Sequence, residues 1–337
     1  MVETTCNADQ ILQHSREMFD RELGGFVPDR VFDAHFEIWD KSQQLDGAVG
    51  VQIPTRWEDV QPGCDVLHPG RQVRAAFIPF AYDATHVDRV NEWSSQQAAR
   101  SGGSCCSYFF ARPDDDPEWL REQVQRLGAV GLKSYHTYSA TQPTWEADIP
   151  QYLPEPFVEV ADQEGWVINM HLVKSRAVAD PGNIHWIRHY CTKYPNIKLI
   201  LSHSARGFQP EHNLEGLPQL ADLKNLYFDS SVNCEPTAHE AIIRYLGHDR
   251  LLYGSDYPCS HVLGRYIAIG DSFAVVDADN PVWQAKHTRI RPALVGLEHL
   301  RSLKWACWSQ RLSDSQVEDI FYGNAERVFG PWMRFQP

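Results

Sequence analysis

The chain has 337 residues, a length that fits one large domain, and 43% of them are hydrophobic, enough to build a sizeable core. Its formal net charge is −13, from 31 basic and 44 acidic residues. The basic residues form no run, which excludes a general nucleic-acid or membrane-surface binder. An anionic small-molecule substrate remains compatible, because local Arg and Lys side chains can set the charge inside one pocket.

Eight cysteines are scattered along the chain without a Cys-x-x-Cys pair. This pattern favours reduced thiols in a cytoplasmic protein over a disulfide framework. The N-terminal residues lead into a charged amphipathic stretch, expected to be a helix over 8–23, and they lack the apolar segment of a signal peptide. No window of 18 continuous apolar residues occurs, so we expect no transmembrane segment.

Short apolar runs alternate with longer segments of helical periodicity, the pattern of parallel βαβ units. The expected strands are 30–39, 74–80, 105–111, 129–135, 166–172, 197–202, 226–229 and 251–254. The expected helices between them include 86–99, 118–127, 155–164, 184–193 and 237–246. Eight such strands in one chain predict an α/β fold, a (β/α)₈ TIM barrel.

We expect one domain over 1–337, with the barrel at about 30–256 and C-terminal helices up to 329. The segment 48–73 is rich in Pro, Gly and charge and shows no crossover helix, so we interpret it as an insertion after strand 1. Within it, 50–53 could alternatively be counted as a strand. A second insertion is expected over 259–287, after strand 8, and both would cover the barrel mouth. The segment 313–329 is expected to be a capped amphipathic helix on the barrel exterior.

Several predicted strands end in a histidine or a carboxylate. These residues are His35 with Glu37, His171, His203 and Asp256. Alternation along a strand points His35 and Glu37 to the same side, together with Asp33. TIM-barrel enzymes place their active sites at the carboxyl ends of the strands, and buried ionisable groups are costly unless paired or metal-bound. A single histidine of this kind is more often structural, but the joint pattern predicts a metal site.

These segments resemble the amidohydrolase-related metal-dependent hydrolases of the amidohydrolase superfamily, a branch that also holds non-oxidative decarboxylases of small aromatic and unsaturated acids. The resemblance is carried by DAHFEIWD (33–40), GAVGLKSYH (128–136), INMHL (168–172), YPNIKLILSHSARGF (194–208), NLYFDSS (225–231), DRLLYGSDYP (249–258) and YGNAERVF (322–329). It covers most of the chain, and the segment 249–258 and the segment around His203 are its most specific parts.

The resemblance implies that His35, His171 and Asp256 are metal ligands, and that Asp256 is also the general base that takes a proton from metal-activated water. His203 would polarise the substrate carbonyl or shuttle a proton. Family members commonly carry a second histidine where this chain has Glu37, and a carboxylate there can also ligate but favours harder ions. We therefore expect one divalent ion, zinc first, with manganese or iron as alternatives.

Lys133 ends the fourth predicted strand, where binuclear relatives carry a carboxylated lysine that bridges two metals. We expect instead a lysine that contacts the substrate or is structural. Tyr135, Arg206 and Tyr257 are further candidates for substrate binding. Arg206 suits bidentate pairing with a carboxylate, and a salt bridge at the barrel rim is an equally good interpretation. Around the mouth we also place His136, Lys174, Asp229 and Ser255.

The leading interpretation is a metal-dependent hydrolase of a small organic acid derivative (a lactone, amide or ester) that acts through metal-activated water. The alternative is a metal-dependent non-oxidative decarboxylase, a carbon–carbon lyase of a small aromatic or unsaturated acid. Glu37 moves the interpretation away from simple amide hydrolysis. A third interpretation is a catalytically degenerate barrel with a binding role. We expect a small-molecule substrate, no nucleic-acid or membrane partner, and leave a homo-oligomer open.

Overall fold

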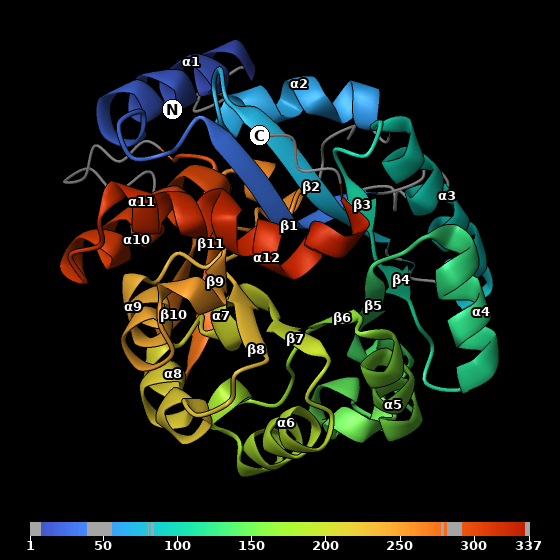
Figure 1. Ribbon diagram of the computed structural model, residues 1–337. Helices are drawn as coiled ribbons and strands as arrows, with labels where there is room; N and C mark the ends of the chain where they lie inside the picture. Colours follow the sequence, from blue (N-terminus) through green and yellow to red (C-terminus); the bar gives the residue numbers. More distant parts are fainter. Residues whose placement is uncertain are drawn as a thin grey trace.

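The computed structural model describes residues 8–38, 56–79, 81, 84–277, 280–281 and 292–333. Parallel strands occupy its centre, as Figure 1 shows. In chain order they are β1 (Arg30–Ile38), β2 (Gln72–Pro79), β3 (Cys106–Ser107), β4 (Phe109–Phe110), β5 (Gly131–Ser134), β6 (Val167–Met170), β7 (Lys198–Leu201), β8 (Leu226–Asp229) and β9 (Leu251–Leu252). Each lies within one of the eight predicted strands or overlaps it, with β3 and β4 both in the third.

The strands form a ring of eight. β1 pairs with β2, β2 pairs with β3, and β4 to β9 pair in order, always in parallel. Only Tyr108 separates β3 from β4, and its N–H donates to the Phe77 carbonyl of β2 at 2.9 Å, so the two are one interrupted strand. Ala34 of β1 donates to the Tyr253 carbonyl beyond β9, also at 2.9 Å, and joins the last strand to the first. The predicted (β/α)₈ barrel is confirmed.

Helices surround the strands in Figure 1. They are α3 (Val87–Arg100), α4 (Pro117–Leu127), α5 (Glu155–Glu164), α6 (Pro181–Lys193), α8 (Pro210–Gly216) and α9 (Pro236–Tyr245). All except α8 were predicted. Local sequence sets the bounds of α4. The Asp116 carboxylate accepts the first free N–H groups, Pro117 is the first residue of the helix, and Gly128 ends it in the left-handed conformation.

The expectation that no helix lies between strands 1 and 2 is wrong. α2 (Trp57–Leu67) occupies part of that segment, although Pro62 lies inside it. An internal proline removes one helical hydrogen bond and disfavours a helix. Trp57, Cys64 and Leu67 are all buried, and we attribute the helix to this burial. The segment 50–53, the alternative strand, lies outside the described residues.

An antiparallel hairpin follows β9, with strands β10 (Gly264–Ile269) and β11 (Ser272–Asp277). It falls in the segment 259–287 that was expected to cover the mouth, and its own strands were not predicted. Its Tyr266 and Phe273 rings lie 5.0 and 4.6 Å from the ring of Phe208, which follows β7. The hairpin therefore packs at the carboxyl end of the barrel.

Helices at both ends of the chain pack on the barrel. α1 (Ala8–Met18) continues as a π-helical turn to Leu23, as predicted for 8–23. α10 (Val295–Ser309) is one of the C-terminal helices expected up to 329, although no bounds were predicted for it. The expected helix 313–329 begins with a Ser313–Gln316 capping box and is divided into α11 (Asp314–Glu318), a π-helical turn and α12 (Asn324–Phe329).

The barrel interior changes from apolar to polar along its axis. Phe329 of α12 stacks on Phe32 with ring centroids 5.1 Å apart and closes the amino end. Side chains two residues apart on a strand share a side. Val167, Ile200 and Tyr227 belong to the apolar layer, and two residues further along come Asn169, Ser202 and Asp229. The carboxyl end of the barrel therefore holds a layer of buried polar groups.

The seven cysteines in the described part of the chain are free thiols, as expected. Of the helices described, none is both long enough and apolar enough to cross a membrane.

Candidate active site

Asp229, at the end of β8, is the centre of the polar layer. Its oxygens lie 2.9 Å from His35 Nδ1 and accept from Asn169 Nδ2 at 3.1 Å, from the His203 N–H at 3.0 Å and from the Ser231 hydroxyl at 2.5 Å. Burial opposes the charged form, but His35, His203 and Ser231 outweigh it and hold the pKa of Asp229 well below its usual range. Asp229 is thus a buried carboxylate anion that is held by hydrogen bonds.

His35 lies between two carboxylates. Its Nδ1 faces Asp229, and its Nε2 lies 3.1 Å from Asp256 Oδ1. Burial alone would lower the pKa of His35, but Asp229 and Asp256 raise it to about 9. A separation of 3.1 Å also suits two ligands of one divalent ion, each about 2.1 Å from it. Asp229 then has the place of the carboxylate that orients a metal-bound imidazole.

The residues present fit a divalent ion. Ligand atoms of His35, Glu37 and Asp256 all lie within 4.8 Å of one another, and so do those of His35, His203 and Asp229. One imidazole and two carboxylates are donors that zinc, manganese and iron accept. The structure therefore brings together three of the four predicted ligands.

His171, the fourth predicted ligand, belongs to neither of these two groups among the described residues. Its ring centroid lies 5.0 Å from that of His203, and its Nδ1 is buried without a hydrogen-bond partner. Burial and the neighbouring His203 lower the pKa of His171 well below its usual range, so the ring is neutral. An unpaired, neutral imidazole nitrogen is available to a ligand.

His203 has a defined tautomer. Its Nδ1 lies 3.2 Å from the Ser231 carbonyl oxygen and 2.9 Å from the Ser231 hydroxyl, which donates its own hydrogen to Asp229. Both partners accept, so Nδ1 carries the proton and Nε2 presents a lone pair. Burial lowers the pKa of His203 to about 4, which keeps the ring neutral. This favours proton transfer over polarisation of a carbonyl, which would need an N–H donor at Nε2.

Lys133 lies beneath the site and not at its surface. It is 1% exposed, and its Nζ donates to Asn169 Oδ1 at 2.6 Å and to Ser202 Oγ at 3.4 Å. Burial lowers the pKa of Lys133, against the opposing charges of Asp229, Glu37 and Asp256. Of the two expected roles, this position favours the structural one, because the ammonium is hydrogen-bonded to buried partners.

Sequence reasoning missed Asn169, Ser202 and Ser231, and it placed Asp229 only at the mouth. A signal existed, because each is a polar residue at or beside the end of an apolar strand. Alternation was expected to point Asp33 to the same side as His35 and Glu37. The register of β1 shifts at a β-bulge between Asp33 and Phe36, so simple alternation fails there. Asp33 instead accepts the backbone N–H groups of His35 and Ser255.

Aromatic rings and one cation line the mouth. The Arg206 guanidinium lies 5.2 Å from the Trp145 ring centroid and 5.7 Å from that of Phe273, and it donates to the Lys174 carbonyl at 2.7 Å. Burial and Arg206 lower the pKa of the neighbouring His136 to about 4. Arg206 is therefore a cation beside two imidazole rings, those of His136 and His171, that are neutral.

The other two predicted substrate contacts differ from each other. Tyr135 lies at the mouth, its ring centroid 4.8 Å from that of His171. Tyr257 does not face the mouth: its ring stacks on Phe36 at 4.6 Å and belongs to an apolar cluster with Trp57. This packing does not support the predicted role in substrate binding, which stays a prediction.

Backbone strain gathers around the site. Nine non-glycine residues of the described chain have positive φ, and eight of them follow β6, β7, β8 or β9. Asp256 is one, at φ 55°, and four more are consecutive in α7 (Ser202–Arg206), from His203 to Arg206. The left-handed conformation costs roughly 1–2 kcal/mol per L-residue, and such strain is concentrated at functional sites.

A glycine permits the closure of the barrel beside the site. A Cβ on Gly254 would lie 2.8 Å from His35 Cβ and 3.3 Å from the His35 nitrogen. Only a glycine lets the chain beyond β9 approach β1 this closely. The same approach brings Asp256 to His35.

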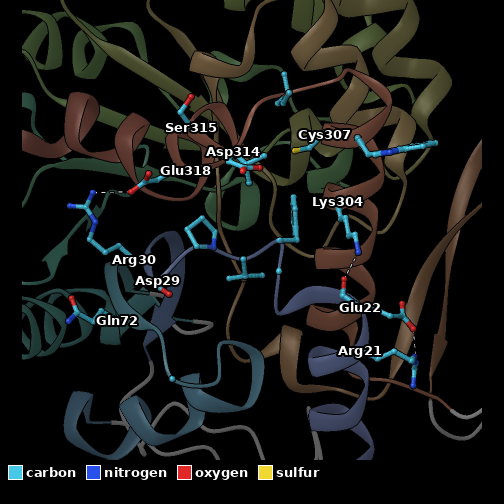
Figure 2. Close-up of a pocket in the computed structure, with 18 residues that line it drawn as sticks. Arg21, Glu22, Asp29, Arg30, Gln72, Lys304, Cys307, Asp314, Ser315 and Glu318 are labelled. Atoms are coloured by element: carbon cyan, nitrogen blue, oxygen red, sulfur yellow. Dashed lines mark hydrogen bonds and ion pairs between the residues drawn. The ribbon is translucent and has the colours of Figure 1, made fainter.

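A separate cavity of about 1370 Å³ lies at the amino end of the barrel, at the starts of β1 and β2 (Figure 2). Its cations already have partners: Arg30 pairs with Glu318 at 3.0 Å, Arg21 pairs with Glu22 at 2.6 Å, and Lys304 donates to the Glu22 carbonyl. Barrel enzymes use the other end for catalysis. We therefore assign function to the carboxyl end.

Comparisons with known proteins agree with this fold. A structure from Acinetobacter baumannii assigned as a 2-pyrone-4,6-dicarboxylic acid hydrolase, with citric acid bound, covers 89% of this chain and 99% of its own at 12% identity and TM-score 0.55. The structure of the 5-carboxyvanillate decarboxylase of Sphingomonas paucimobilis is similar over 90% of this chain and 99% of its own chain, with 14% sequence identity and a TM-score of 0.55. The structure of a dihydroxybenzoic acid decarboxylase from a Polaromonas species, with bound manganese, is similar over 90% of this chain and 96% of its own chain. Its sequence identity is 17% and its TM-score is 0.52.

At these identities the structures establish the fold alone. The comparison with curated proteins finds no match. The model of the amidohydrolase family, in contrast, matches residues 32–330, nearly the whole chain and all the strands of the barrel except the start of β1. The chain therefore belongs to the amidohydrolase family.

Proposed function

We propose that this protein is a metal-dependent hydrolase of a small organic acid derivative, a lactone, amide or ester. One observation carries the proposal: His35 Nε2 and Asp256 Oδ1 lie 3.1 Å apart at the carboxyl end of the barrel, with Asp229 behind His35. His35, Glu37 and Asp256 would hold one divalent ion, and the unpaired His171 would complete its ligands. Zinc is the first expectation, with manganese or iron as alternatives.

A divalent ion at this position supplies Lewis acidity, which makes water a nucleophile near neutral pH and polarises a substrate carbonyl. Asp256 would take the proton from the attacking water, because it is a charged carboxylate at the reacting position. Burial opposes ionisation, but His203 and His35 keep the pKa of Asp256 below its usual value. His203 would move a proton through Nε2. Asp229 would orient the His35 imidazole directly and the His203 imidazole through the Ser231 hydroxyl.

The mouth suits a planar acid. Arg206 offers guanidinium N–H groups to a carboxylate, and Trp145, Tyr135 and Phe273 supply aromatic walls. The neutral rings of His136 and His171 add no competing charge. The substrate would bind with its carboxylate at Arg206 and its reacting carbonyl at the ion.

A non-oxidative decarboxylase is the alternative, and Glu37 favours it. A carboxylate ligand lowers the Lewis acidity of the ion relative to a second histidine, which weakens the case for activated water. The same residues would then hold an ion that takes up the carboxylate and neighbouring oxygen of an aromatic or unsaturated acid. Assays of CO₂ release and of lactone or ester opening, run in parallel on the same preparation, distinguish the two reactions.

We expect one tightly held divalent ion per chain, lost on substitution of His35. His35→Gln removes the ring nitrogen that faces Asp256, so the metal content should fall from about one equivalent to a small fraction. Elemental analysis of purified protein, grown with zinc, manganese and iron, measures this. His185→Gln, on the exposed face of α6, is the control. A folded wild-type protein without metal in all three media would contradict the proposal.

We expect Arg206→Gln to raise KM for a carboxylate substrate by about 10–100-fold, because a charge-assisted hydrogen bond contributes about 1.5–3 kcal/mol. The KM of Arg206→Lys should lie between those of Arg206→Gln and the wild type, since a lysine keeps the charge and loses the bidentate geometry. Steady-state kinetics with the acid and with its neutral methyl ester test this. The KM for the ester should be unchanged in both variants, and an equal loss on both substrates would refute the assignment.

A further inference from the structure

The turn α7 carries two proposed functional side chains, His203 and Arg206, on four consecutive residues whose φ values lie between 53° and 60°. L-residues leave this conformation unless their surroundings hold it. We infer that His239 and Asn213 are positioning residues, which fasten this turn and thereby place His203 and Arg206. The catalytic part of this inference rests on the proposed function, and the structural part does not.

His239, on α9, holds the turn through Ser204. The Ser204 hydroxyl lies 2.8 Å from His239 Nδ1, and His239 Nε2 lies 3.0 Å from the Asn233 carbonyl oxygen. A carbonyl only accepts, so Nε2 carries the proton and the Ser204 hydroxyl donates to Nδ1. The ring is fully buried and stays neutral. The tautomer of His239 therefore fixes the direction of the Ser204 side chain.

Asn213, on α8, holds the backbone of the same turn. Its Nδ2 donates to the Ser204 carbonyl at 2.8 Å, and Asn233 Nδ2 donates to the His203 carbonyl at 3.2 Å. A Cβ on Gly207 would lie 2.5 Å from Asn213 Oδ1, so this glycine lets the amide come close. Two successive carbonyls of the strained turn thus end on buried amides.

The two helices act on one rigid unit. The His203 N–H is bound by Asp229, and Arg206 donates to the Lys174 carbonyl, so the turn is also fixed on the side of the site. A rotation of the turn would displace both the proton-transferring imidazole and the substrate-binding guanidinium. Loss of either helix contact should therefore lower kcat and raise KM together, whereas a change at His203 or Arg206 alone affects mainly one of them.

The test compares Asn213→Leu and His239→Phe with Val124→Ala, a buried residue of α4 far from the turn in Figure 1. Leucine and phenylalanine keep the approximate volume and remove the hydrogen bonds. We expect amide hydrogen exchange over 203–207 to rise at least about tenfold. We expect kcat/KM to fall at least about tenfold at unchanged metal content. Val124→Ala should lower the melting temperature without either effect.

His239→Gln, whose amide can still donate to the Asn233 carbonyl, should show slower amide exchange over 203–207 and a higher kcat/KM than His239→Phe. If a bulky variant does not fold, Ser204→Ala removes the His239 contact without adding volume. If amide exchange over 203–207 in these variants is as slow as in the wild type, the inference is wrong. It is also wrong if Val124→Ala loses as much activity as these variants when its melting temperature is lowered to the same extent. If the wild-type enzyme turns over no substrate, the proposed function fails, and the exchange measurements still decide whether the two residues hold the turn.

Discussion

Asp256→Asn is expected to lower kcat by about 10²–10⁴-fold, the usual loss when a general base is removed. The fold should survive, because Asp256 has φ 55° and asparagine tolerates the left-handed conformation as well as aspartate does. The amide oxygen can still ligate, so some metal should remain bound. Initial rates divided by the metal content of the same sample separate the loss of the base from the loss of the ion.

Asp222→Asn is the matched control for this variant. Asp222 makes the same kind of interaction, a carboxylate paired with a cation, but it lies on the surface with Arg188 at 2.6 Å. Its substitution should leave kcat and metal content unchanged. If Asp256→Asn keeps activity within tenfold of the wild type at full metal content, Asp256 is only a ligand and the base must be sought elsewhere.

The barrel was predictable because most residues of its strands are buried and mainly apolar, and because helical segments alternate with them. β8 (Leu226–Asp229) and α5 (Glu155–Glu164) have the predicted bounds to the residue. The helix α2 was not predictable from periodicity, since Pro62 and Gly63 indicate a loop. Its stability comes from tertiary burial of Trp57 and Leu67, which a local pattern does not contain.

The site was predictable where function depends on the ends of strands. His35, Glu37 and Asp256 were expected together and lie together. The hydrogen-bond network around Asp229 was not expected, because its donors come from segments far apart in sequence. The left-handed turn was even harder to predict from the sequence. The sequence Ser-His-Ser-Ala-Arg contains no glycine or asparagine, so local propensity opposes the observed conformation and only tertiary contacts select it.

His203→Asn is expected to keep most of the metal and to lose most of the activity, about 10²–10⁴-fold in kcat. Asparagine suits φ 57° at this position better than histidine, so the strained turn should persist. Its amide nitrogen can replace Nδ1 as donor to Ser231. The substitution therefore removes one feature, the lone pair at Nε2, and leaves the turn and the Ser231 contact in place.

Metal content, amide exchange over 203–207 and kcat, measured on the same His203→Asn sample, decide between three roles. Full metal, normal exchange and a large loss of kcat support proton transfer by His203. Loss of the metal would make His203 a primary ligand, as its place within 4.8 Å of His35 and Asp229 allows, and would contradict the proton-transfer role. Activity near that of the wild type, together with an active Asp256→Asn variant, would favour a barrel that binds its ligand without catalysis.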